Sequence, residues 1–213
     1  MLENLIIIDI IGKYASTSLL YLGGFMYEEL RRIQETIENY KALDKVVDAL
    51  IKDADFTPPL TVAEDVIKKL GGTVVIEDFN DMYEGRVMKL ADDKFKIRIT
   101  PFDAESTQKN YTIYLALAFL MMDFGFIVQQ EEWRKQDSFE WLYQGLNERI
   151  PIEYKVYFAL ALQMPRSMFI EKVEENTKEG TVELKPIAEY FGVSCSSVSK
   201  RGKDIGILKD DWD

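Results

Sequence analysis

The sequence predicts an α+β protein, mostly helical, with a small three-stranded antiparallel sheet packed on a buried apolar helix and a C-terminal helix-turn-helix-like unit. Three observations predict this class. Apolar residues recur at helical spacing across residues 25–50. Three short β-rich segments follow between residues 73 and 100. An apolar run at residues 111–128 then indicates a core helix.

Residues 1–57 are expected to form an N-terminal helical extension that Pro58-Pro59 ends, because proline lacks an amide hydrogen. A short helix over residues 62–70 should follow, since Thr61 and Glu64 have the spacing of a capping box. The apolar stripe of the extension comprises Met26, Leu30, Ile33, Ile37, Leu43, Val46, Val47 and Leu50.

The three predicted strands form an antiparallel meander, with Asp92-Asp93 as a tight turn between the second and the third. A polar loop over residues 101–110 should then lead into the core helix. The strands are expected at residues 73–77, 85–90 and 95–100.

The second half of the chain is expected to be helical. Residues 131–149 are polar with spaced aromatic side chains, which predicts one or two amphipathic helices. Pro151 should open another helix, which Met164-Pro165 ends. Residues 171–180 are charged and predict a solvated connector.

Composition restricts the function. The net charge of −11 disfavours broad, charge-driven nucleic-acid binding, but it leaves a local patch that contacts nucleic acid as an alternative. No secretory signal precedes the apolar residues 5–11, and the lone Cys195 fits a reducing compartment, so we expect a cytoplasmic protein. The run at residues 111–128 contains Asp123, which favours a core helix over a membrane span.

Two short motifs and the order of the elements carry a resemblance. Tyr111-Thr112-Ile113 opens the apolar helix, and Phe158-Ala159 precedes Gln163-Met164-Pro165 at the end of a later helix. With a helix and a small sheet before them, these motifs resemble the ImmA/IrrE-type family of zinc metallopeptidase-like proteins. The resemblance implies a metallopeptidase-like domain over residues 58–170, followed by a helix-turn-helix-like unit at residues 181–213.

The chain departs from that family where the chemistry lies. The two histidine positions of the HExxH motif fall on Leu115 and Phe119, the catalytic glutamate position on Ala116, and the third, acidic ligand near Tyr154. These apolar side chains neither bind zinc nor accept a proton, and the chain contains no histidine. We therefore expect no metal, no cofactor and no enzymatic activity.

Two alternatives remain for catalytic or metal-binding groups. Asp123, one turn beyond the second histidine position, is either a retained polar or carboxylate metal site or a helix-end residue paired with a neighbour, charged or protonated. Ser197 and Lys200 have the spacing of a Ser–Lys dyad, but that spacing is common by chance. An enzyme of unrelated chemistry is the least favoured hypothesis.

The C-terminal pattern predicts a helix-turn-helix shape, with Gly192 in the turn and Ser194 capping the second helix. Such a unit either packs against protein, which we favour, or contacts nucleic acid. In the second case the contacts would come from Ser196, Ser197, Lys200, Arg201 and Lys203.

The leading hypothesis is a catalytically inactive, ImmA/IrrE-like protein that regulates by binding and is encoded by a phage or another mobile element. Its expected partner is a repressor-type regulator, because members of the resembled family act on or pair with such proteins. The N-terminal helices should cover the former cleft or form a homodimer. The alternative is a DNA-binding transcriptional regulator that uses the C-terminal unit.

Overall fold

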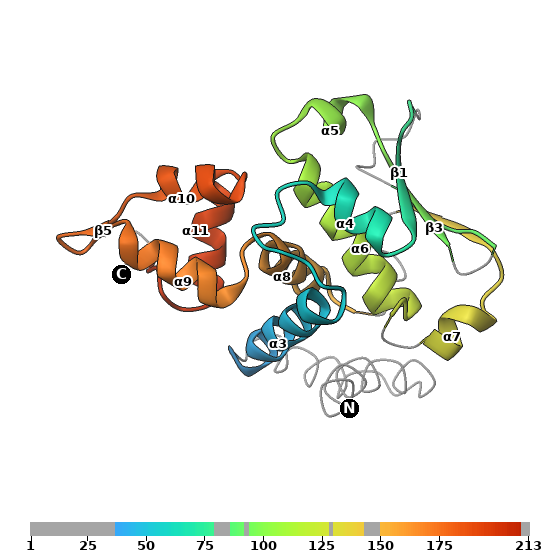
Figure 1. Ribbon diagram of the computed structural model, residues 1–213, viewed down its shortest axis with the longest axis horizontal. Coiled ribbons are helices and arrows are strands. Elements are labelled where there is room, and N and C mark those ends of the chain that lie inside the picture. Colours follow the sequence, from blue (N-terminus) through green and yellow to red (C-terminus); the bar gives the residue numbers. More distant parts are fainter. Residues whose placement is uncertain (1–36, 79–85, 92–93, 128–129, 143–149, 210–213) are drawn as a thin grey trace, which may run out of the picture.

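The computed structural model describes residues 37–78, 86–91, 94–127, 130–142 and 150–209. Most of its helices lie to one side of a small sheet (Figure 1). The helices are α3 (Ile37–Asp53), α4 (Ala63–Lys69), α5 (Pro101–Glu105), α6 (Lys109–Phe124), α7 (Gln130–Lys135), α8 (Ile152–Gln163), α9 (Arg166–Glu175), α10 (Leu184–Phe191) and α11 (Cys195–Asp204). The strands are β1 (Gly72–Ile76), β2 (Arg86–Lys89), β3 (Phe95–Ile99), β4 (Phe139–Leu142), β5 (Thr177–Lys178) and β6 (Thr181–Val182).

The main sheet is mixed and has the strand order β1-β3-β2-β4 among the described strands. β1 runs parallel to β3, with Val74 opposite Ile97, whereas β2 is antiparallel to both β3 and β4. The predicted antiparallel meander is therefore wrong in one pairing. The chain crosses from β1 to the far side of β3 before β2 begins, and alternation within a strand does not specify its neighbour.

One face of the sheet is covered by helices. Phe95, Ile97 and Ile99 of β3 are buried, and the residues between them are half-buried, which is the alternation of a sheet covered on one side. Helix α6 contacts β2 and β3, and α4 contacts β1. The predicted packing of the sheet on the apolar helix is thus confirmed.

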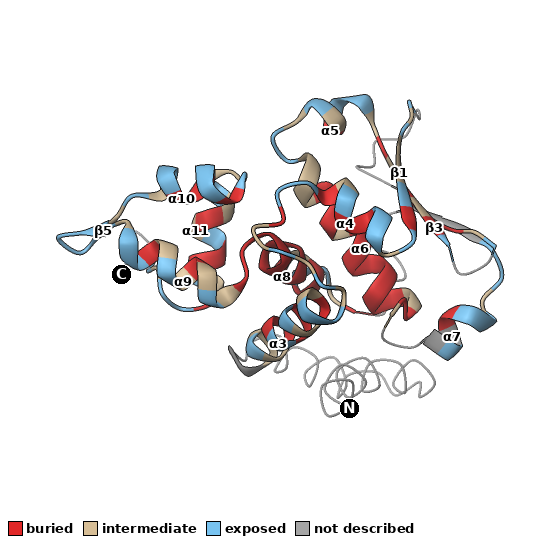
Figure 2. Ribbon diagram, viewed as in Figure 1, coloured by how far each residue is buried: buried red, intermediate tan, exposed pale blue. Residues whose placement is uncertain are grey.

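Helix α6 is the centre of the core. Its residues from Thr112 to Asp123 are buried except Leu115, so almost every face of the helix lies against protein (Figure 2). It ends at Gly125, whose φ of +74° is a left-handed conformation that glycine adopts without steric cost. Helix α8 packs along α6, and α3 packs on α8 (Figure 1).

The C-terminal helices lie at the opposite end of the molecule from the sheet (Figure 1). Helix α10 ends at Gly192, with φ +64°, and the Ser194 hydroxyl accepts a hydrogen bond from the amide of Ser197 at the start of α11. The predicted turn and cap are confirmed, whereas the helix-turn-helix assignment itself stays a prediction. No helix in the described ranges is long and apolar enough to cross a membrane.

Several predicted elements are corrected. The polar loop after β3 contains α5, whose N-cap is Thr100. Only α7 is helical in the described part of residues 131–149, and β4 follows it as an edge strand. The charged connector contains the end of α9 and the β5–β6 hairpin. Short polar helices and edge strands carry weak periodicity, because little of their surface is buried.

Of three further predictions, one is wrong and two lie wholly or partly outside the described residues. Thr61 does not cap α4: the N-cap is Val62, without a side-chain hydrogen bond. Residues 1–36 of the N-terminal extension and the Asp92-Asp93 turn lie outside the described residues. The described part of the extension is α3, which confirms a helix there.

Candidate functional site

The four positions that the sequence resemblance assigns to the zinc site lie in the α6–α8 core. Ala116, Phe119 and Tyr154 are each at most 2% exposed, and Leu115 is half-buried against the hydrophobic core. Residues four apart lie on one face of a helix, so Leu115 and Phe119 share a face of α6. The former catalytic positions are therefore part of the packed interior.

Helix α3 covers this region from the α8 side. The amide of Asn39 donates to the Tyr154 hydroxyl at 3.3 Å. The ring of Tyr40 lies edge-on to Tyr154, with centroids 6.1 Å apart, and stacks on Tyr157 at 4.0 Å. Burial, followed by the nearby carboxylate of Asp204, raises the pKa of Tyr40 to about 12. The expectation that an N-terminal helix covers the former cleft thus has a structural counterpart in α3.

Asp123 does not stand alone. Its carboxylate lies 2.9 Å from the ammonium of Lys155, whose side chain is fully buried, and it accepts a hydrogen bond from the amide of Ile150 at 3.2 Å. Of the alternatives for Asp123, the structure favours the residue paired with a neighbour, which is Lys155. The sequence placed Lys155 beside Tyr154 but gave no sign of this contact.

The donor set does not fit zinc. A structural or catalytic zinc site takes three or four ligands from histidine, cysteine and carboxylate side chains. The described part of the chain holds no group of three such residues placed to bind one metal ion. The full sequence has no histidine and one cysteine, Cys195, which is exposed on α11. The side chains at the four assigned positions are hydrocarbon and phenol groups, and none of them is a typical zinc ligand.

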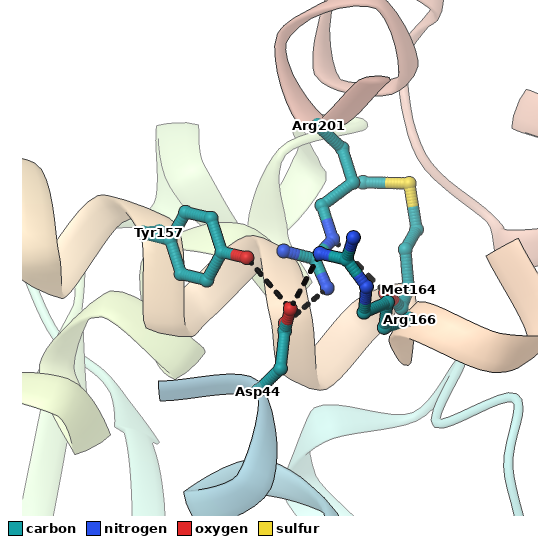
Figure 3. Close-up of polar contacts among 5 residues, drawn as sticks. All are labelled: Asp44, Tyr157, Met164, Arg166 and Arg201. Carbon is teal, nitrogen blue, oxygen red and sulfur yellow. Dashed lines mark hydrogen bonds and ion pairs between the residues drawn. The ribbon is translucent and has the colours of Figure 1, made fainter. Parts of the chain in front are cut away.

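A second buried polar cluster links α3 to the C-terminal helices (Figure 3). One Asp44 carboxylate oxygen accepts from the Arg201 guanidinium at 2.6 Å, and the other from the Tyr157 hydroxyl at 2.8 Å and from Arg166 at 3.1 Å. Arg201 also donates to the Met164 carbonyl and lies over the Tyr157 ring, 4.7 Å from its centroid. Burial is the main cause of the raised pKa of Tyr157.

This cluster corrects one predicted nucleic-acid contact. Arg201 is fully buried and bound to Asp44, so its guanidinium faces the protein interior and not solvent. A sequence signal existed for both residues. Asp44 lies three residues before buried Val47 on α3, and Arg201 lies three residues after buried Val198 on α11, so both fall on core-facing sides.

The other four candidate nucleic-acid contacts differ in their exposure. Ser196, Lys200 and Lys203 are exposed, whereas Ser197 is half-buried and its hydroxyl lies 2.9 Å from that of Ser194. The Lys200 ammonium pairs with Asp204 at 3.1 Å. Ser197 therefore takes part in the helix cap, and nucleic-acid contact by these four residues stays a prediction.

Comparison with known proteins agrees with the resemblance. The family model of the M78 peptidases, described as an IrrE N-terminal-like domain, matches residues 146–203. This match confirms the resemblance to the ImmA/IrrE-type family over α8 to α11. It does not extend to α6, so the assignment of Leu115, Ala116 and Phe119 to zinc-site positions rests on the motif alone. No curated protein matches the chain in sequence.

One similar solved structure is a Mycobacterium tuberculosis transcriptional regulator, at 19% sequence identity and a TM-score of 0.52. The superposition covers 84% of this chain, and the chain spans about half (51%) of that protein. At this identity the likeness concerns the fold, and it supports the α+β architecture described above.

Proposed function

We propose that this protein is a catalytically inactive, ImmA/IrrE-like regulator that acts by binding another protein. The observation that carries the proposal is the apolar, closed interior at the former catalytic positions. Phe119 and Tyr154 are buried there, and Asn39 and Tyr40 of α3 lie over Tyr154. Among the described residues, the side chains at these positions supply neither a metal ligand nor a base to activate a water.

The chemistry of the resembled peptidases supports inactivity. Zinc lowers the pKa of its bound water to about 7, and a glutamate then removes the proton. Alanine at the glutamate position and leucine and phenylalanine at the histidine positions remove both functions together. Without a metal and a base, the fold retains shape and surface, which are the properties that a binding protein needs.

The partner that we propose is a repressor-type transcription regulator, in a phage or another mobile element. Members of the resembled family act on or pair with such regulators, and the similar solved structure is described as a transcriptional regulator. The strongly acidic chain, with net charge −11, also favours a protein partner over a nucleic-acid one.

The test uses the full-length protein as bait in a lysate of its host, followed by mass spectrometry of the captured proteins. The captured partner is then purified and incubated with the protein and Zn²⁺. We expect a stable complex in which the mass of the partner is unchanged. Cleavage of the partner, together with one zinc bound per chain, would refute the proposal.

A second candidate function is DNA binding through α11. The observation that favours it is the exposure of Ser196, Lys200 and Lys203 on that helix. Phosphate contacts would make the affinity fall steeply with salt. Lys200→Ala and Lys203→Ala should then each weaken binding, whereas Lys185→Ala on α10, also exposed, should not. Absent or salt-insensitive binding would dismiss this candidate.

A further inference from the structure

Lys155 is a buried cation that the proposed function does not use. Its side chain is fully buried on α8, next to Tyr154. The ammonium lies 2.9 Å from an oxygen of Asp123, donates to the Ile150 carbonyl at 2.5 Å, and lies 4.3 Å from the centroid of the Phe119 ring. A buried lysine is rare unless it is paired, so this arrangement is a built site for one positive charge.

The contacts of Lys155 join three segments. Asp123 belongs to the last turn of α6, Ile150 precedes α8, and Lys155 itself lies in the first turns of α8. The Asp123 carboxylate also accepts a hydrogen bond from the Ile150 amide at 3.2 Å. The ammonium therefore cross-links α6 and α8 close to the position where the resembled peptidases hold their second histidine.

We infer that Lys155 is the resident cation of the former metal region, and that its ammonium both cross-links α6 to α8 and keeps divalent ions out. This inference rests on the proposal that the zinc site of the family is lost. A zinc ion lies about 2.0–2.1 Å from a ligating imidazole nitrogen. An ion bound at position 119 would thus lie within a few ångströms of a buried ammonium, and like charges repel strongly at such distances in the interior.

The first experiment restores the metal ligands with and without the lysine. Both chains carry Leu115→His, Phe119→His and Tyr154→Glu, and one also carries Lys155→Met. Zn²⁺ affinity is measured by competition with a chromophoric chelator. We expect the chain without Lys155 to bind Zn²⁺ at least about tenfold more tightly, because one repelling charge has been removed.

A matched control separates this effect from the general loss of a buried lysine. Lys89→Met is added to the restored chain in place of Lys155→Met; Lys89 is 6% exposed and lies over the Trp133 ring, 5.1 Å from its centroid. This control should leave the Zn²⁺ affinity within about twofold of the chain that keeps Lys155. Equal affinities with and without Lys155, including no binding in either chain, would overturn the inference.

A second experiment needs no restored ligands and tests the cross-link between α6 and α8 separately from the exclusion of divalent ions. It is a double-mutant cycle of Lys155→Met and Asp123→Leu in the otherwise natural sequence, measured by urea unfolding. Each single substitution should lower the folded-to-unfolded ratio by about 100-fold or more, because it leaves a buried charge without its partner. The double variant should recover at least about tenfold of the summed loss; additive losses would overturn the inference.

The outcomes distinguish this inference from the proposed function. Stoichiometric Zn²⁺ in the natural protein with cleavage of its partner would refute the proposed function. Equal zinc affinities of the restored chains would refute the role of Lys155 and leave an inactive, partner-binding protein in place.

Discussion

Asp44 shows how one carboxylate positions side chains from three helices. It lies on α3 and accepts hydrogen bonds from Tyr157 of α8, Arg201 of α11 and Arg166 of α9. Replacing one member of a buried ion pair is costly, because the remaining charge stays out of water without compensation. Asp53, an exposed residue at the end of the same helix, serves as the control.

Asp44→Asn is therefore expected to lower the free energy of unfolding by about 3–5 kcal/mol, since the buried Arg201 guanidinium loses its counter-ion. Urea unfolding followed by circular dichroism measures this change. Asp53→Asn, an exposed position at the end of α3, should change stability by less than about 0.5 kcal/mol. Similar effects of the two substitutions would contradict the structure of this cluster.

Because the phenol of Tyr40 is partly buried, we expect the protein to become less stable at high pH. Its pKa is raised from 10.0 to about 12, mainly by burial, so the folded state favours the neutral form. The stability that this group contributes is complete below pH 10 and is lost as the pH rises toward 12. A tyrosinate absorbance titration of the natural chain minus that of Tyr40→Phe should show a midpoint near pH 12; a midpoint near 10 would contradict this environment.

Among the elements, α4 has its first turn capped by a side chain from α6, which is distant in sequence. The side-chain oxygen of Asn110 in α6 accepts from the Ala63 amide at 3.2 Å, and its nitrogen donates to the Thr61 carbonyl at 2.7 Å. Asn110 thus does for the first turn of α4 what a capping residue does locally. The sequence suggested Thr61 for this role, because local spacing does not report a cap supplied from 47 residues away.

This difference can be measured. Asn110→Ala should cost about 1–2 kcal/mol, because it removes the partner of the Ala63 amide and of the Thr61 carbonyl. Thr61→Ala should cost less than about 0.5 kcal/mol, since Thr61 is exposed and is not the cap. Chemical unfolding of the two variants measures both stability losses. A larger loss for Thr61→Ala than for Asn110→Ala would contradict this account and support the predicted capping box.

The elements that the sequence predicts well have a strong local signal. Helix α3 has an apolar stripe, α6 a long apolar run, and α8 a proline at either end, while strands β1, β2 and β3 have alternating patterns or β-branched residues. Strand β4 and helix α9 were missed. The parallel pairing of β1 with β3 was also missed, since it depends on how the chain crosses the sheet and not on either strand alone.

At the scale of the whole molecule, the candidate site could be predicted only in part. The absence of a zinc-binding histidine pair follows from residue types, since the sequence contains no histidine. The closing of the region by Asn39 and Tyr40, and the buried Lys155–Asp123 pair, depend on contacts between residues distant in sequence. Such contacts leave no local pattern, so only the structure reports them.

The architecture also links the two ends of the described chain. Helix α3 contacts α8, and α11 contacts α8 from the C-terminal side, with the Asp44–Arg201 pair between them (Figure 3). Changes on α3 are therefore expected to alter the stability of the C-terminal helices as well. Hydrogen exchange of the α10 and α11 amides in Asp44→Asn should be faster than in the natural chain; unchanged exchange would mean that the two ends are independent.

The central claim is that the core of this metallopeptidase-like fold stands without a divalent metal. A ligand that binds only the folded state raises the unfolding temperature, and the stabilisation grows with the logarithm of the ratio of its concentration to its dissociation constant. The direct measurement is thermal unfolding of the full chain in excess Zn²⁺ and in excess chelator, together with the zinc content of the purified protein. We predict equal unfolding temperatures and no stoichiometric zinc; one zinc per chain and a lower unfolding temperature in chelator would contradict the claim.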